Sequence, residues 1–219
     1  MKKSPCKVKQ ISLLLGSVSL PLGAISVLAG DDASGGMTMP PPGLRSGGYI
    51  ATDAGVNLAD DLSISSGSIS LSPGVRWDFS TGYAIKLSDQ ITLAPEVELG
   101  VIYNALASAS AGPYSGSYLQ VPVMANAILN WQMDIPNLVF YAGGGAGLDF
   151  NILNVSGVNG IGLDVTGGET DFAWQVMAGV KYSFGSSEVG VGYKYLAVQP
   201  SGLETEGNNT ILLCYTLHF

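Results

Sequence analysis

The stretch Ile211-Leu212-Leu213-Cys214-Tyr215-Thr216-Leu217-His218-Phe219 decides the fold, because an apolar residue stands at every second position of it. Successive side chains of a β-strand point to opposite faces of a sheet, so the odd-numbered residues from Ile211 to Phe219 would form one continuous apolar face. The even-numbered residues, which include Thr216 and His218, would take the other face. The segment therefore predicts a final β-strand whose apolar face needs a protein core or lipid beside it.

Seven further segments upstream are also rich in Val, Ile, Tyr, Phe and Trp and are bounded by Gly, Ser, Asp and Asn. Each is about ten residues or longer, which is the length that a tilted strand needs to cross the hydrocarbon of a membrane. The eight predicted strands are residues 49–58, 72–83, 90–104, 117–132, 138–152, 171–184, 188–198 and 210–219.

The links between these strands alternate in length. Short links at residues 84–89, 133–137 and 185–187 alternate with long ones, rich in Gly, Ser, Asn and acids, at residues 59–71, 105–116, 154–170 and 199–209. Short turns on the periplasmic side and long loops outside are typical of an up-and-down barrel in the outer membrane. We therefore predict an all-β fold, namely an eight-stranded antiparallel up-and-down transmembrane β-barrel.

The alternation within each strand leaves open which face is inside. In the second strand, Val75, Trp77 and Phe79 would oppose Arg76 and Asp78. A soluble sandwich or lipocalin-like barrel would bury the apolar face, whereas a membrane barrel would turn it toward lipid and the charges toward the lumen. Aromatic residues stand mostly near the strand ends, where a membrane barrel has its interfacial girdles. This placement favours the membrane barrel.

Three of the segments carry a family resemblance. They are Gln120-Val121-Pro122-Val123 followed by Asn126, Phe172-Ala173-Trp174-Gln175 followed by Gly179-Val180-Lys181-Tyr182, and Gly192-Tyr193-Lys194-Tyr195-Leu196. These segments look like the fourth, sixth and seventh strands of the OmpA/OmpX-like family of outer-membrane β-barrels. The resemblance covers about residues 47–219. It implies a location in the bacterial outer membrane, among its lipids and lipopolysaccharide.

The final strand adds to this resemblance. A terminal aromatic residue after an alternating strand, here Phe219 with Leu217 and Tyr215 on the same face, resembles the C-terminal signal that the family's barrel assembly machinery reads. The resemblance implies that this machinery is a partner through the C-terminal strand. It implies no particular surface ligand and no cofactor.

The N-terminus predicts a secretory signal peptide. Four lysines precede an apolar stretch at residues 11–28, and Val27-Leu28-Ala29 offers small or modest residues for a signal peptidase, so residues 1–29 would be removed. The alternative is a membrane anchor, although Pro21 and two glycines interrupt the stretch. Residues 30–47, rich in Gly and Pro, are predicted to be a flexible periplasmic lead-in, and residues 48–219 the barrel.

Charge and cysteine content exclude some partners and bonds. The predicted signal peptide removes four of the nine Lys and Arg residues and none of the seventeen Asp and Glu residues, so the mature chain would be more acidic than the formal charge of −8 for the whole sequence. An acidic surface repels phosphate backbones, so no nucleic-acid partner is expected. Cys214 would be the only mature cysteine, which excludes an intramolecular disulfide.

A set of charged residues is predicted to face the lumen. An eight-stranded barrel is barely wider than its side chains, so opposite charges there have to pair to offset the loss of water. A structural plug and a gated, narrow ion path remain alternative interpretations. The predicted lumen charges are Arg76, Asp78, Glu96, Glu98, Asp149, Lys181 and Lys194.

Catalytic residues are not predicted. His218 is the only histidine of the chain and would lie at the periplasmic rim, whereas lipid-modifying barrels of the family place a histidine and a serine near the outer rim. We predict no catalytic, cofactor or metal site. The function predicted is a structural or surface-interaction role, such as adhesion or recognition, through four extracellular loops. The first alternative is a narrow porin for small solutes or ions, and a more distant one is a lipid-modifying enzyme.

Overall fold

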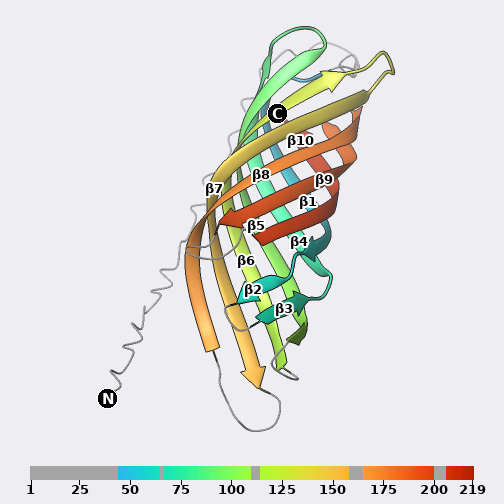
Figure 1. The fold of residues 1–219 in the computed structure, drawn as a ribbon. Helices are drawn as coiled ribbons and strands as arrows, with labels where there is room; N and C mark the ends of the chain where they lie inside the picture. The colour runs from blue at the N-terminus through green and yellow to red at the C-terminus, as the bar shows by residue number, and fades with distance from the viewer. Residues whose placement is uncertain (1–43, 65–66, 110–113, 158–164, 200–205) are drawn as a thin grey trace, which may run out of the picture. The chain divides into compact units, whose positions relative to one another are not determined.

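The computed structural model describes residues 44–64, 67–109, 114–157, 165–199 and 206–219 of the 219-residue chain. The predicted signal peptide, and all of the predicted lead-in before Leu44, lie outside the described residues and stay predictions. The described residues form an antiparallel barrel whose strands run obliquely around a common axis (Figure 1). No helix that is long and apolar enough to span a bilayer occurs among them.

Eight strands of the described chain form the barrel wall, and each pairs antiparallel with its neighbours. The ring closes because β10 pairs with β1 as well as with β9. The predicted fold class is therefore confirmed. The wall strands are β1 (Gly47–Ala59), β4 (Gly74–Lys86), β5 (Ile91–Ala109), β6 (Tyr114–Gln132), β7 (Leu138–Gly157), β8 (Val165–Phe184), β9 (Ser187–Gln199) and β10 (Glu206–His218).

The two ends of the barrel differ. At one end, which we call the turn end, short turns join β4 to β5, β6 to β7 and β8 to β9. Asn137 and Gly185 adopt positive φ angles of 66° and 58° in two of these turns, a conformation that Asn and Gly tolerate best. The opposite end, the loop end, holds the other connections. The C-terminus lies at the turn end, uppermost in Figure 1.

The loop end is more regular than the sequence predicts. The predicted loop at residues 59–71 contains two short strands, β2 (Leu62–Ile64) and β3 (Gly67–Leu71), and β3 continues the sheet by pairing with β5. Strands β5 to β8 are 19 or 20 residues long, against 13 for the other wall strands. The parts of these four strands nearest the loop end are rich in Ala, Ser and Gly. These parts therefore lack the apolar alternation that identifies a strand beside lipid.

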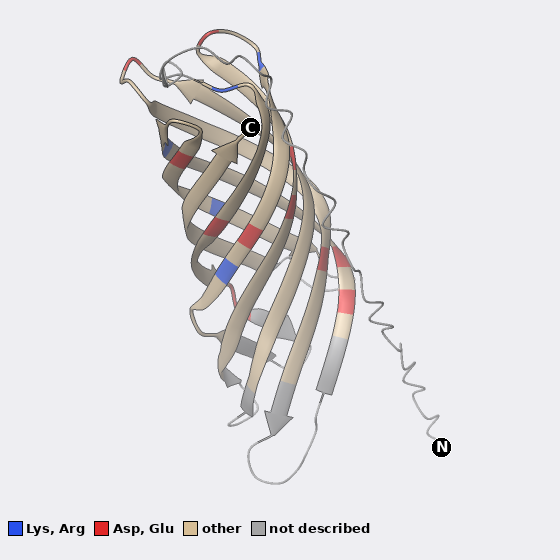
Figure 2. Ribbon diagram, turned by 180° about the vertical axis from the view of Figure 1, so that it is seen from behind, with Lys and Arg blue, Asp and Glu red and all other residues tan. Residues whose placement is uncertain are grey.

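The barrel wall is apolar outside and polar inside. Along β4, Val75, Trp77 and Phe79 are 62%, 67% and 54% exposed, whereas Arg76 and Asp78 are each 1% exposed. Figure 2 shows few charged residues along the wall strands. This is the arrangement of a membrane barrel, since a soluble barrel would expose the charges and bury the apolar side chains.

The lumen is filled in layers. Along β5, Ala94 belongs to an apolar cluster toward the turn end, Glu98 to a polar layer, and Ile102 to a second apolar cluster toward the loop end. Strands β6 and β8 repeat this order. The turn-end apolar cluster is Tyr49, Ala51, Ala84, Ala94, Ile128, Tyr141, Met177, Leu212 and Cys214. The loop-end apolar cluster is Ile102, Met124, Ala173, Leu196 and Val198.

A charge on the outer face tests this inside-out arrangement. Val176 of β8 points outward between the inward-facing Gln175 and Met177. We expect Val176→Arg to lower the free energy of unfolding by about 2 to 4 kcal/mol, measured by urea unfolding in lipid vesicles with folded and unfolded protein separated on unheated gels. Val176→Ile is the control and should unfold at the wild-type urea concentration. Equal urea midpoints for the two variants would contradict a lipid-facing Val176.

Candidate functional site in the barrel lumen

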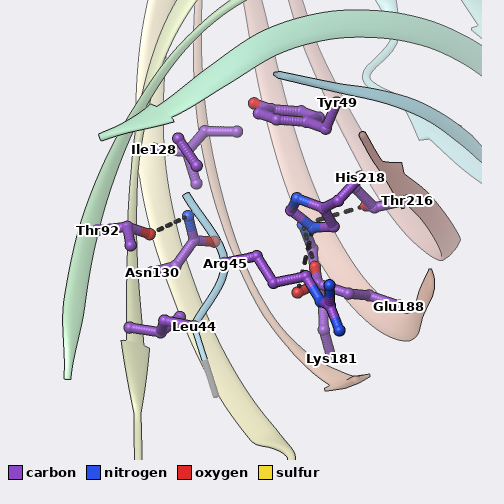
Figure 3. Close-up of a pocket in the computed structure, with 11 residues that line it drawn as sticks. Leu44, Arg45, Tyr49, Thr92, Ile128, Asn130, Lys181, Glu188, Thr216 and His218 are labelled. Carbon is purple, nitrogen blue, oxygen red and sulfur yellow. Dashed lines mark hydrogen bonds and ion pairs between the residues drawn. The ribbon is translucent and has the colours of Figure 1, made fainter. Parts of the chain in front are cut away.

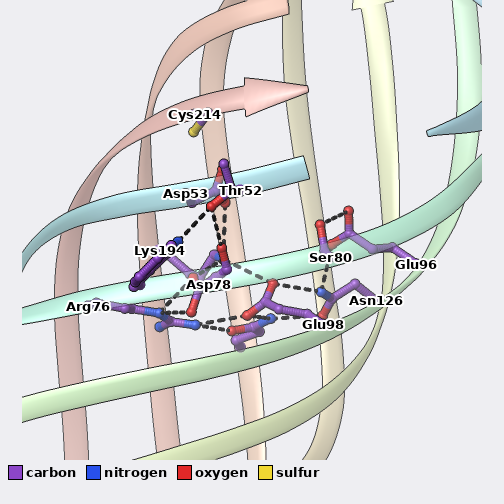
Figure 4. Close-up of polar contacts among 12 residues, drawn as sticks. Thr52, Asp53, Arg76, Asp78, Ser80, Glu96, Glu98, Asn126, Lys194 and Cys214 are labelled. Atoms are coloured by element: carbon purple, nitrogen blue, oxygen red, sulfur yellow. Dashed lines mark hydrogen bonds and ion pairs between the residues drawn. The ribbon is translucent and has the colours of Figure 1, made fainter. Parts of the chain in front are cut away.

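Arg76 is the centre of the polar layer. It projects inward from β4, and its guanidinium is wholly buried. Arg76 Nε lies 2.8 Å from Asp78 Oδ2, and Arg76 Nη2 lies 2.9 Å from Glu98 Oε1 on the neighbouring β5. Arg76 Nη2 also donates a hydrogen bond to Gln175 Oε1 across the lumen, at 3.1 Å. One side chain therefore contacts three strands of the wall (Figure 4).

Lys194 of β9 reaches the same carboxylates from the opposite wall. Its Nζ lies 2.7 Å from Asp78 Oδ2, 3.0 Å from Glu98 Oε2 and 3.5 Å from Asp53 Oδ2. Two buried cations thus share three carboxylates. Removing charges from water is costly, and close pairing with further hydrogen bonds is what offsets that cost inside a protein. Losing one partner here would leave a buried charge unpaired.

Asn126 extends the polar layer to β6. Its Nδ2 donates to Glu98 Oε2 at 3.0 Å and to Glu96 Oε1 at 3.1 Å, and its Oδ1 accepts a bond from Gln175 Nε2 at 2.9 Å. Gly145 lies opposite Asn126 on β7, and a Cβ atom at that position would collide with Asn126 Oδ1. The glycine-rich part of β7 thus leaves room for a longer side chain on the facing strand.

Glu96 connects this layer to the turn-end apolar cluster. Its Oε2 accepts hydrogen bonds from the Tyr49 hydroxyl at 2.9 Å and from Ser80 Oγ at 3.0 Å. The connected polar side chains therefore come from β1, β4, β5, β6, β8 and β9. We call the set the central network: Tyr49, Asp53, Arg76, Asp78, Ser80, Glu96, Glu98, Asn126, Gln175 and Lys194.

The structure brings together five of the seven predicted lumen charges, namely Arg76, Asp78, Glu96, Glu98 and Lys194. The other two lie elsewhere in the lumen. Lys181 is at the turn end, where its Nζ is 3.8 Å from Glu188 Oε2. Asp149 lies toward the loop end and accepts a hydrogen bond from Gln120 Nε2 at 3.3 Å. Alternation identifies the face of a residue but not its height along the barrel axis.

Sequence reasoning missed five members of the central network: Tyr49, Asp53, Ser80, Asn126 and Gln175. The signal for Asp53 was present, because it stands on the inward face of the first strand and pairs in register with Asp78. Asn126 and Gln175 also fall on the polar face of their strands, but the sequence does not indicate which residues they would contact. Contacts across the lumen depend on the stagger between strands, which the sequence does not state.

The chemistry of this arrangement is structural. Its charged groups face one another, and most of their polar atoms already make hydrogen bonds. Among the residues that the structure describes, no group of three or more His, Cys, Asp or Glu side chains is placed to hold a metal ion. His218 lies beside Glu188 at the turn end, and its ring centre is 5.7 Å from that of Tyr49, the member of the central network nearest that end.

The residues of the predicted assembly signal lie on β10 or directly after it. Tyr215 and Phe219 are exposed on the outer side, and Leu217 is partly exposed between them. The Phe219 N–H donates to Gly48 O at 3.0 Å, which extends the β1–β10 pairing to the end of the strand. Recognition of these residues by an assembly machinery stays a prediction.

Removal of Arg76 tests the central network. Arg76→Ala would leave Asp78 and Glu98 buried with less positive charge beside them, so we expect the free energy of unfolding to fall by about 3 to 5 kcal/mol, measured in the same urea assay. Lys86→Ala is the control, because Lys86 pairs only with the exposed Asp89, at 2.8 Å. That variant should keep the wild-type urea midpoint. A wild-type midpoint for Arg76→Ala would contradict a stabilising central network.

No protein-family model matches the sequence, and no curated protein matches it either. The fold is similar to solved structures. Neisserial surface protein A is 19% identical, with a TM-score of 0.56, over 80% of this chain and 98% of that one. The attachment invasion locus protein of Yersinia pestis is 10% identical, with a TM-score of 0.48, over 80% of this chain and 100% of that one. The outer membrane enzyme PagL is 14% identical, with a TM-score of 0.43, over 78% of this chain and 99% of that one. The chain therefore has the fold of the eight-stranded bacterial outer-membrane β-barrels, in agreement with the location predicted from its sequence.

Proposed function

We propose that this protein is a non-catalytic outer-membrane barrel with a structural or surface-interaction role, and that its loops at the cell surface carry any adhesion or recognition. The observation that carries the proposal is the filled lumen. When its own side chains occupy the interior of a barrel, only the two ends and the outer wall can contact other molecules. The proposal takes the loop end as extracellular and the turn end as periplasmic.

The filling of the lumen supports a closed barrel. An ion that moved along the axis would have to separate the pairs that Arg76 and Lys194 make with Asp78 and Glu98, and also pass two apolar clusters. Buried charges separated from their partners cost several kcal/mol. Apolar layers without polar partners for an ion or water add to that barrier.

The long strands support a role at the loop end. A 13-residue strand at the usual tilt already crosses a bilayer, so strands β5 to β8 extend about six residues, or roughly 20 Å of strand, further. This extension has a small core of its own: Tyr118 is buried against Leu71, Leu106 and Leu153, which come from β3, β5 and β7. A rigid, packed extension is a scaffold of the kind on which binding loops are held.

A narrow pore is the second candidate, and one observation favours it. In the described part of the chain, the buried atoms Arg76 Nη1 and Gln120 Oε1 have no hydrogen-bond partner. Buried polar atoms of this kind are normally satisfied, by protein or by water. Water bound beside these two atoms would hydrate part of the lumen, and a hydrated lumen is what a gated ion path needs.

Conductance separates these two candidates. In planar bilayers we expect the folded wild-type protein to show only small or rare openings, because its charges are paired and flanked by apolar layers. A wide porin reconstituted in the same lipid at the same protein-to-lipid ratio is the control for insertion. Large, steady wild-type currents would replace the closed-barrel proposal with the pore.

Loop replacement tests where an interaction resides. We expect Gly-Ser segments of equal length in place of residues 158–164 and 200–205 to abolish attachment of expressing bacteria to epithelial cell layers, while heat-modifiable gel mobility stays that of the folded barrel. The matched control replaces Asp134 and Ile135 in a turn-end turn by Gly-Ser. A strain from which the gene is deleted is compared in parallel. If that strain becomes more sensitive to detergent but attaches as the wild type does, the role is structural. Attachment that is lost on deletion of the gene but kept by the loop variant would exclude these two segments as the site of the interaction.

A further inference from the structure

A small cavity lies at the turn end of the lumen and shares only Tyr49 with the central network. Its volume is about 20 Å³, and the turn-end apolar cluster, through Tyr49, Ala84 and Ile128, lies between it and most of the central network. The polar side chains that line it come from β5, β6, β8, β9 and β10 and from the segment before β1 (Figure 3). They are Arg45, Thr92, Asn130, Lys181, Glu188, Thr216 and His218.

Among the residues that the structure describes, three basic side chains and one carboxylate line this cavity. Glu188 Oε2 lies 3.8 Å from Lys181 Nζ, and Glu188 Oε1 lies 3.3 Å from His218 Nε2. Lys181 Nζ also donates to Thr216 Oγ1 at 3.4 Å and stands 4.9 Å from the centre of the Tyr141 ring. Glu188 is thus already shared by two side chains, and Arg45 adds a further positive charge to the same cavity.

Two of these basic groups have buried nitrogens without a hydrogen-bond partner. Within the described part of the chain they are Nε of Arg45 and the ring nitrogens of His218, of which Nε2 has only the 3.3 Å contact with Glu188 Oε1. The His218 side chain is only 10% exposed. The Leu44 N–H donates to Gln132 Oε1 at 3.0 Å, which fixes the segment that carries Arg45 across the mouth of the barrel. Arg45 Nε can only donate and therefore requires an acceptor, whereas a neutral histidine ring offers one donor nitrogen and one acceptor nitrogen.

We propose that this cavity binds one compact anion between Arg45 and His218. A water molecule would accept a hydrogen bond from Arg45 Nε, but it would leave the excess positive charge uncompensated, whereas an anion supplies both the acceptor and the opposite charge. The volume of about 20 Å³ is close to that of one water-sized sphere. This size admits a halide ion or one carboxylate oxygen. The occupant is a dissolved halide or a carboxylate group that enters from the turn end.

The single histidine of the chain makes the cavity directly observable. In protein purified through a histidine-free tag, ring-labelled His218 gives one set of NMR signals, and these report the cavity alone. At fixed pH and ionic strength, with gluconate as the background anion, we expect chloride to shift the His218 ring signals in a saturable way. A parallel titration with acetate distinguishes a carboxylate from a halide as the occupant.

Two variants make the test specific. Arg45→Gln should weaken the apparent affinity at least tenfold, because it removes the unpaired charge, and heat-modifiable gel mobility shows whether the barrel still folds. Lys86→Gln is the control, because this substitution also removes one positive charge. Lys86 pairs with Asp89 outside the cavity, so the Lys86→Gln protein should give the wild-type titration. Saturation by either anion that depends on Arg45 supports the proposal. No saturable shift with chloride or acetate, or equal shifts in the Arg45→Gln protein, would overturn it and assign the cavity to water.

Discussion

The pairing of β10 with β1 is the interaction on which the rest of the structure depends. In a bilayer, each backbone N–H and C=O has to find its partner within the protein, and a sheet satisfies this condition only if it has no free edge. The register that closes the ring also decides which face of each strand points inward. Arg76 and Lys194 are buried, and Val75 and Trp77 face outward, because that register holds around the whole wall.

Once the ring is closed, side chains have to fill the lumen. Charged side chains can fill it as stably as apolar ones only if each has a partner of opposite charge. The central network meets this condition by spanning six strands, so that Glu98 touches Arg76, Asn126 and Lys194 at once. The same low-dielectric interior makes each of these contacts strong and each loss costly. A polar layer between two apolar clusters therefore both ties the walls together and separates the two ends of the barrel.

Alternation, the lengths of the links and the aromatic residues near the strand ends were together sufficient to predict the fold class, the number of wall strands and the face of most charged residues, because each is a local property of the chain. It did not predict that Lys181 and Asp149 would lie at other heights than Arg76, since stagger between strands is set by the whole ring. The hairpin of β2 and β3 was missed because strands of three and five residues beyond the lipid carry too little pattern. The cavity at Arg45 was missed because it needs residues from six separate segments.

The closure of the ring has a consequence for the order of folding. Asn57 of β1 donates to Asn208 of β10 across 151 positions of the chain, so the first strand of the wall finds its second neighbour only after the last strand has been made. Contacts of such separation carry a large loop-closure entropy and form slowly. Until then β1 has one edge without a partner, and the chain has to be kept from pairing with other molecules. The time needed to bring its two ends together thus governs how long this protein is vulnerable to aggregation.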